Sequence, residues 1–161
     1  MRHVRPMGTS GGRRDVDELR SGLGRWLRFT RGAELADITH PSAGLSNETL
    51  IVTLDDGIRL VVRLPPTLAS FPNHEFAVQA LVMEVADRDG VAVPAPVEVV
   101  TDESWLGVPF IVMPFVEGHI PGPASVLDPW RTDATPPEQR AAQTAMVDVL
   151  AAISRVDWRT G

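Results

Sequence analysis

LSNETLIVTLDDGIRLVVRL, residues 45–64, carries the clearest structural signal in the chain. Two runs rich in β-forming residues, 45–54 and 58–64, flank a turn that contains Gly57. An Asp-Gly turn between two such runs is typical of a β-hairpin, because glycine readily adopts the backbone conformation that a tight turn requires. The sequence therefore predicts an antiparallel hairpin near the centre of the domain.

Further helices and strands are predicted on either side of this hairpin. Apolar residues recur at helical spacing over 15–30, and a second helix with a broad apolar surface is predicted over 73–87. Two more strands are predicted over 96–105 and 109–118, and a last amphipathic helix over 137–156. Strands joined as hairpins with one inserted helix predict an α+β fold, with a mostly antiparallel sheet and a helix on one face.

The composition indicates a folded domain and excludes several kinds of functional site. The chain has 161 residues, 43% of them hydrophobic and 22% charged, which is typical of one folded domain or lobe. The absence of cysteine excludes disulfides, thiolate metal sites and a cysteine nucleophile. The four histidines lie far apart in the sequence, so we expect no zinc site.

The charge and hydropathy patterns argue against nucleic acids and membranes as partners. A net charge of −6 argues against a general nucleic-acid-binding surface. No apolar run approaches the roughly 20 residues that span a bilayer, and the Arg-rich N-terminus lacks the apolar stretch of a secretory signal. We therefore expect a cytoplasmic protein without a membrane partner. All 15 cationic side chains are arginine, so any site that elsewhere uses lysine must here use arginine.

Five short motifs occur in an order that is typical of a known family. They are GLSNET (44–49), LVVRLPP (60–66), HEFAVQAL (74–81), VAVPAPV (91–97) and LGVPFIVMPFVEG (106–118). In this order they resemble the N-terminal lobe of the aminoglycoside phosphotransferase/choline-kinase-like family, which has the protein-kinase-like fold. They are most similar to the branch that occurs as the kinase-like domain of acyl-CoA dehydrogenase family proteins. The resemblance extends over about residues 16–161.

The resemblance implies that a turn with Ser42, Gly44, Ser46 and Asn47 lies over the phosphates of a nucleotide. Glycine lets the backbone come close to the ligand, and main-chain N–H groups then point at an anion. Ala43 stands where a second glycine is common in the family. From the residues alone, a polar loop before a strand is the alternative interpretation.

The resemblance also implies that Arg63 contacts the α- and β-phosphates and that Glu75, on the following helix, pairs with it. In protein kinases a lysine takes the strand position. A guanidinium preserves the charge and holds phosphate and carboxylate bidentately. The residues alone leave two alternatives open, a solvent-facing strand arginine and a glutamate that interacts with the helix dipole.

The strand within 109–118 would supply the adenine-binding hinge of the resembled fold. Met113 would be the gatekeeper, with the carbonyl of Pro114 accepting from adenine and the N–H of Val116 donating to it. Proline lacks an N–H but keeps its carbonyl, so it is compatible with a position that needs only an acceptor. The alternative from the residues alone is a core strand with a bulge at the proline.

Residues 1–14 are rich in Gly and Arg and lack a regular apolar period, which predicts a flexible tail. The resemblance divides the rest into a nucleotide-binding N-lobe (15–118) and a linker with the first helix of an incomplete C-lobe (119–161). It implies ATP as cofactor, with Mg²⁺ expected only if the rest of the second lobe is supplied. The sequence contains no H-x-D-x-x-x-x-N catalytic loop. We therefore assign no catalytic or metal-binding residue, and we expect a truncated gene product, a fragment or one part of a split protein.

Two functional hypotheses follow. The first is the nucleotide-binding part of an ATP-dependent small-molecule phosphotransferase that does not catalyse alone, so that enzyme activity stays an open question. Its partners would be a nucleotide and, in the full-length relative, a small hydroxyl-bearing substrate. The last helix would contact the rest of a C-lobe or drive self-association. The alternative is a non-catalytic α+β regulatory or interaction module with the same fold.

Overall fold

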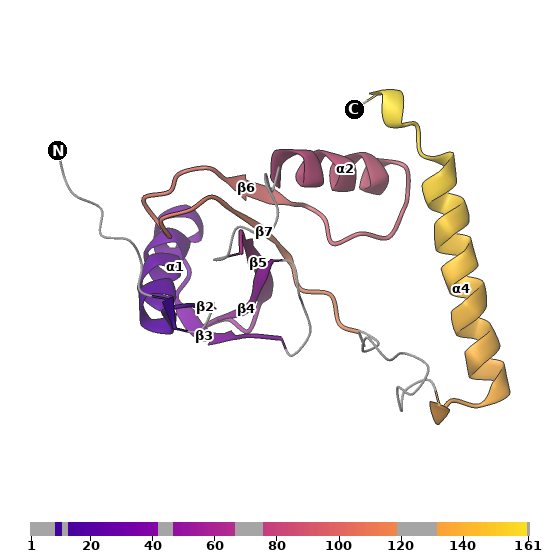
Figure 1. The fold of residues 1–161 in the computed structure, drawn as a ribbon, viewed down its shortest axis with the longest axis horizontal. Helices are drawn as coiled ribbons and strands as arrows, with labels where there is room; N and C mark the ends of the chain where they lie inside the picture. Colours follow the sequence, from indigo (N-terminus) through magenta and orange to yellow (C-terminus); the bar gives the residue numbers. More distant parts are fainter. Residues whose placement is uncertain (1–8, 11–12, 42–46, 67–75, 119–131, 161) are drawn as a thin grey trace.

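The computed structural model describes residues 9–10, 13–41, 47–66, 76–118 and 132–160. Over these residues the main sheet has five antiparallel strands in the spatial order β3-β4-β5-β7-β6. The strands are β3 (Leu35–Thr39), β4 (Glu48–Leu54), β5 (Arg59–Leu64), β6 (Glu98–Val100) and β7 (Phe110–Pro114). The helices are α1 (Val16–Arg31), α2 (Phe76–Arg88) and α4 (Pro136–Arg155), followed by the short 3-10 helix η2 (Trp158–Thr160). The α+β class, the antiparallel sheet and the inserted helix are confirmed (Figure 1).

The predicted hairpin is formed by β4 and β5, with Gly57 at a positive φ of 85° in the turn. The predicted strand over 96–105 is shorter, because only Glu98–Val100 pair with β7. The edge strand β3 was not predicted. A register shift between Leu35 and Asp37 interrupts the apolar–polar alternation by which a strand is recognised in a sequence.

Helices cover both faces of the sheet, whereas the sequence predicts a helix on one face. The apolar stripe of α1 packs on the even-numbered side chains of β4, β5 and β7. The α1 residues in this core are Leu19, Leu23, Trp26 and Leu27. On the opposite face, Phe76 and Ala80 of α2 pack on Ile111 and Met113 of β7. Side chains alternate along a strand, so β7 can serve both cores.

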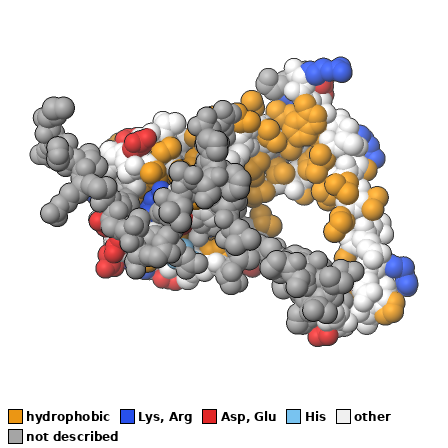
Figure 2. All heavy atoms as spheres, viewed as in Figure 1, with side chains coloured by type: hydrophobic (Ala, Val, Ile, Leu, Met, Phe, Trp, Pro, Cys, Tyr) orange, Lys and Arg blue, Asp and Glu red, His pale blue; other side chains and the backbone are white. Residues whose placement is uncertain are grey.

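The C-terminal end of helix α4 packs against the end of α2. Val156 and Ala152 pack against a small apolar group at the end of α2, and the N–H of Asp157 donates to Asp89 over 3.0 Å. The Arg88 guanidinium, which donates to Asp89, holds the pKa of that carboxyl below its usual range. The predicted apolar stripe of α4 is exposed, at Ala142, Met146, Val149, Leu150 and Ile153. Figure 2 shows hydrophobic side chains gathered where α2 approaches α4.

Arg14, the last residue of the tail predicted over 1–14, lies in a two-stranded sheet and forms a buried ion pair. It lies in β2 (Arg13–Arg14), which pairs with β1 (Thr9–Ser10). Its guanidinium donates to Glu48 Oε2 at 2.6 Å and to the Pro65 carbonyl at 2.8 Å, and its main-chain N–H donates to Glu48 Oε1 at 3.2 Å. The side chains of Arg14 and Glu48 are only 7% and 5% exposed, so each compensates the buried charge of the other.

The described helices include none that is both long enough and apolar enough to cross a bilayer.

The contact between α1 and the turn before β7 depends on a glycine. A Cβ at Gly22 would lie 2.3 Å from the Trp105 carbonyl oxygen, whereas a Cβ at Gly24 would have Arg28 Nη2, at 3.9 Å, as its nearest neighbour. We expect Gly22→Ala to lower the free energy of unfolding by about 1–3 kcal/mol because it overpacks the contact. The matched control Gly24→Ala should leave it unchanged or raise it by up to about 1 kcal/mol. Urea unfolding of both variants tests this, and equal effects would contradict it.

The buried ion pair makes a second prediction. Glu48→Ala should lower the free energy of unfolding by about 3–5 kcal/mol, because Arg14 would remain buried without a counter-charge. The double variant Arg14→Met/Glu48→Leu should recover most of this loss, since no uncompensated charge remains. A double variant as unstable as Glu48→Ala, measured by thermal or urea unfolding, would show that the pair is not coupled as described.

Candidate functional site

The face of the sheet opposite α1 is partly open over β4 and β5. Thr49 and Ile51 of β4 and Val61 and Arg63 of β5 are all half-buried. The strand register places Thr49 opposite Arg63 and Ile51 opposite Val61. These side chains therefore form one surface, with Arg63 beside the apolar pair Ile51 and Val61, and this surface is the centre of the candidate site.

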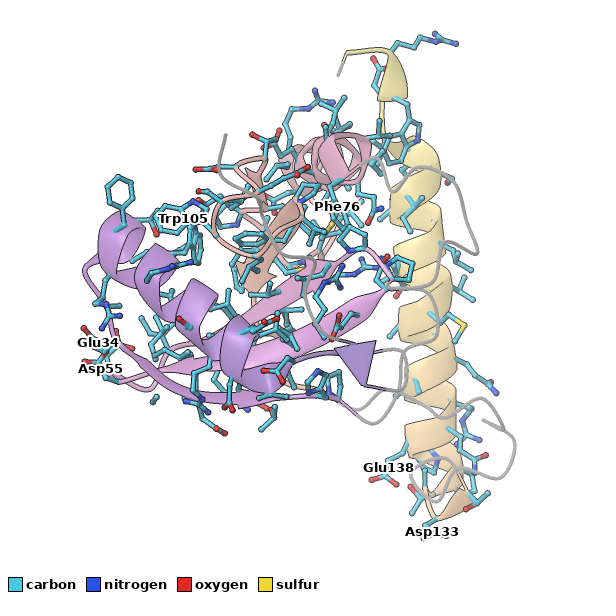
Figure 3. The ribbon with its side chains drawn as sticks, turned by 60° about the vertical axis from the view of Figure 1, so that its left-hand side comes forward. Glu34, Asp55, Phe76, Trp105, Asp133 and Glu138 are labelled. Atoms are coloured by element: carbon cyan, nitrogen blue, oxygen red, sulfur yellow. The ribbon has the colours of Figure 1, made fainter. Side chains whose placement is uncertain are left out.

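Arg63 lies on the same face of the sheet as α2. Its cross-strand neighbour on β7 is Ile111, which is fully buried and packs with Phe76, the first residue of α2. Figure 3 shows Phe76 where α2 meets the sheet. The first residue of α2 therefore packs next to Ile111, which is the β7 neighbour of Arg63. Glu75 immediately precedes Phe76 but lies outside the described residues, so its ion pair with Arg63 stays a prediction.

The predicted phosphate turn connects β3 to β4 at the same end of the sheet as Arg63. Ser42, Gly44 and Ser46 lie outside the described residues, and Asn47 is half-buried directly before β4. Both strands that carry the turn belong to the main sheet and pair with each other. The buried Arg14–Glu48 pair lies at the base of this turn, because Glu48 is the first residue of β4. His40, directly after β3, brings its Nε2 to 3.6 Å from Glu48 Oε1.

The predicted hinge follows the end of β7. Met113 is buried against the α2 side of the sheet, opposite Val61. The N–H of Phe115 donates to the carbonyl of Arg59 at 3.1 Å. Because main-chain groups of successive residues in an extended strand point to opposite edges, the carbonyl of Pro114 faces away from β5.

On the side of β7 that faces β6, strand pairing ends before Pro114. The pairing of β6 with β7 stops at Glu98 and Val112. Two residues further along this register, Pro96 would face Pro114, and neither nitrogen carries a hydrogen to donate. The Pro114 carbonyl therefore lies where β6 cannot supply a ladder hydrogen bond. Val116, two residues on, is 64% exposed.

The structure thus places Arg63 and Met113 on the α2 face of the sheet, Pro114 at the end of β7 and Asn47 directly before β4. Sequence reasoning missed the role of Arg14 and Glu48 at the base of the turn. The alternation along β4 contained the signal, since it puts Glu48 on the same buried face as Leu50 and Val52, where a carboxylate needs a cation. Among the residues that the structure describes, no group of three or more acidic or histidine side chains could hold a metal ion.

The chain is similar to parts of two known proteins. The chain is 32% identical over 125 residues to the Acyl-CoA dehydrogenase family member 10 of Mus musculus, a match that covers 77% of this chain and 11% of that protein. A crystal structure of a protein from Thermobifida fusca, provisionally assigned as a fructosamine-3-kinase, superposes with a TM-score of 0.41 at 22% identity. That match covers 63% of this chain and 33% of the other. The chain therefore spans a minor part of each of these proteins.

The model of the phosphotransferase enzyme family matches residues 37–161, from β3 through α4 and η2. The matched part contains the candidate surface on β4 and β5 and also Asn47 and the predicted hinge up to Val116. This chain belongs to the phosphotransferase enzyme family.

Proposed function

We propose that this chain is the nucleotide-binding part of an ATP-dependent small-molecule phosphotransferase. The observation that carries the proposal is the combination of Arg63 on the partly open sheet face with the Pro114 carbonyl at the end of β7, in a phosphotransferase-family protein. Ile111, the partner of Arg63, and Pro114 are three residues apart on β7, or roughly 10 Å at the rise of a strand. This separation is comparable to that between the base and the inner phosphates of an extended nucleoside triphosphate.

Adenine would bind at the hinge end of this surface. The carbonyl of Pro114 would accept a hydrogen bond from the exocyclic amine. The N–H of Val116, two residues further along, would donate to a ring nitrogen of adenine. Ile51 and Val61 would contact the apolar face of the ring, since both are half-buried and adjacent in the sheet. Met113 would close the inner end of the pocket as the gatekeeper.

The phosphates would bind at the other end. Main-chain N–H groups of the turn with Ser42, Gly44, Ser46 and Asn47 would surround them. The Arg63 guanidinium would contact the α- and β-phosphates, and Glu75 would orient it. Mg²⁺ would require ligands beyond this part of the protein.

We propose that this chain alone does not transfer phosphate. Transfer requires a base beside the acceptor hydroxyl and metal ligands beside the γ-phosphate. The sequence offers no H-x-D-x-x-x-x-N loop to supply them. The exposed apolar stripe of α4 suits packing against further helices of a second lobe or self-association. The phosphate acceptor would be a small hydroxyl-bearing molecule held by that lobe, and the compartment would be the cytoplasm.

Titration with Mg-ATP tests the proposal. Because half a cleft leaves the nucleotide open to water, we expect a Kd of about 1 mM, so that about 10 mM Mg-ATP should stabilise the fold by roughly 1.4 kcal/mol. Arg63→Ala should weaken binding at least tenfold through loss of a charge-assisted contact. The matched control Arg20→Ala, which removes an exposed α1 side chain paired with Asp37, should bind as the wild type does.

An unchanged melting temperature of the wild-type chain at all nucleotide concentrations would favour the non-catalytic module instead. Phosphate transfer by this chain to alcohols or aminoglycosides would contradict its proposed incompetence. Turnover that survives Arg63→Ala would contradict the assignment of Arg63.

A further inference from the structure

We propose that Arg59 is a positioning residue for adenine recognition, which it supports by fixing the segment 115–117 after β7. This inference rests on the proposed function. Arg59 makes no contact with the nucleotide in the arrangement proposed above. It acts through the main-chain groups of Pro114 and Val116, which it holds from the opposite edge of the strand.

Three contacts join Arg59 to this segment. Its main-chain carbonyl accepts from the N–H of Phe115 at 3.1 Å. Its guanidinium lies over the Phe115 ring, with Cζ 4.1 Å from the centroid, and forms an ion pair with the carboxylate of Glu117. Arginine is suited to this double contact, because its plane stacks on an aromatic ring while its N–H groups remain available to a carboxylate.

Among the residues that the structure describes, neither strand pairing with β6 nor burial holds this segment. Strand pairing with β6 has ended at Glu98 and Val112, and prolines stand where it would continue. Burial does not fix the segment either, since Val116 is 64% exposed and the Glu117 side chain is 78% exposed. The side chain of Arg59 therefore carries much of the orientation of residues 115–117.

Anchoring alternate residues fixes the ones between them. The N–H of Phe115 and the carboxylate of Glu117 both contact Arg59 of β5, while the carbonyl of Pro114 faces the opposite edge, where the N–H of Val116 would also act in the proposed site. Ordering these two groups before the ligand arrives removes an entropic cost from adenine binding. Arg59 should therefore affect ligands that contain adenine and leave phosphate binding unchanged.

The test compares Mg-ATP with Mg-tripolyphosphate, which has the charge but no base. Binding is followed by amide chemical-shift titration of the ¹⁵N-labelled chain. Arg59→Ala should raise the Kd for Mg-ATP about tenfold and leave the Kd for Mg-tripolyphosphate within about twofold of the wild type. Arg63→Ala, by contrast, should weaken both ligands. Equal loss of both ligands in Arg59→Ala would overturn the inference, because it would indicate direct phosphate binding or a global defect.

Two further variants separate positioning from charge. Arg59→Lys keeps the positive charge but loses the planar stack on Phe115, and we expect a Kd for Mg-ATP between those of the wild type and Arg59→Ala. Glu117→Gln removes the ion pair and one negative charge from the segment. It should weaken Mg-ATP a few-fold, whereas tighter binding would show that long-range charge dominates and would overturn the inference.

A measurement without nucleotide keeps the two proposals distinguishable. In the free chain, Arg59→Ala should lower the ¹⁵N order parameters of Val116 and Glu117 while the unfolding midpoint stays near that of the wild type. Unchanged order parameters, or wild-type Mg-ATP affinity in this variant, would overturn the role of Arg59 and leave the proposed function standing. If the wild-type chain binds Mg-tripolyphosphate and Mg-ATP equally or not at all, the adenine site itself is wrong, and the proposed function fails with it.

Discussion

The alternation of side chains along β5 connects the hydrophobic core to the candidate site. Leu60, Val62 and Leu64 are buried against α1, while Arg59, Val61 and Arg63 occupy the opposite, partly open face. A slip of one residue would exchange these two sets and place guanidinium groups in the apolar core. The burial of three large apolar side chains therefore stabilises the register that presents both arginines to the site face.

Prolines limit strand pairing beside the proposed hinge. Pro114 ends β7, and Pro96 stands where β6 would continue the pairing. A missing N–H is unfavourable inside a sheet, but at this place it keeps the Pro114 carbonyl out of a ladder. After β7, Phe115 and Glu117 contact Arg59 through a main-chain hydrogen bond, a cation–π contact and an ion pair. Proline therefore both ends the pairing of β6 with β7 and leaves the Pro114 carbonyl without a strand partner on the β6 side.

An ion pair stabilises the strand ends that flank the proposed phosphate turn. Its two flanking strands pair with each other, and the Arg14–Glu48 ion pair joins the start of β4 to the segment before α1. A buried ion pair contributes less net stability than its short distance suggests, because both charges lose their hydration. Its stronger effect is to define one arrangement, since any other leaves a charge buried alone. Through this ion pair, Arg14 helps to fix the start of β4, which borders the candidate site.

Local signals in the sequence were sufficient for the hairpin, the three helices and the central strands, because each depends on turn chemistry or on a regular apolar period. They also singled out Arg63 and the Met113–Val116 hinge as candidates, through the order of motifs shared with a known family. The edge strand β3 was missed because its bulge interrupts the alternation at Leu35 and Asp37. The covering of the second sheet face by α1, the burial of Arg14 against Glu48 and the stacking of Arg59 on Phe115 each join residues far apart in the chain. Such pairings depend on how strands and helices are placed in space, and a one-dimensional pattern of residue types does not contain that placement.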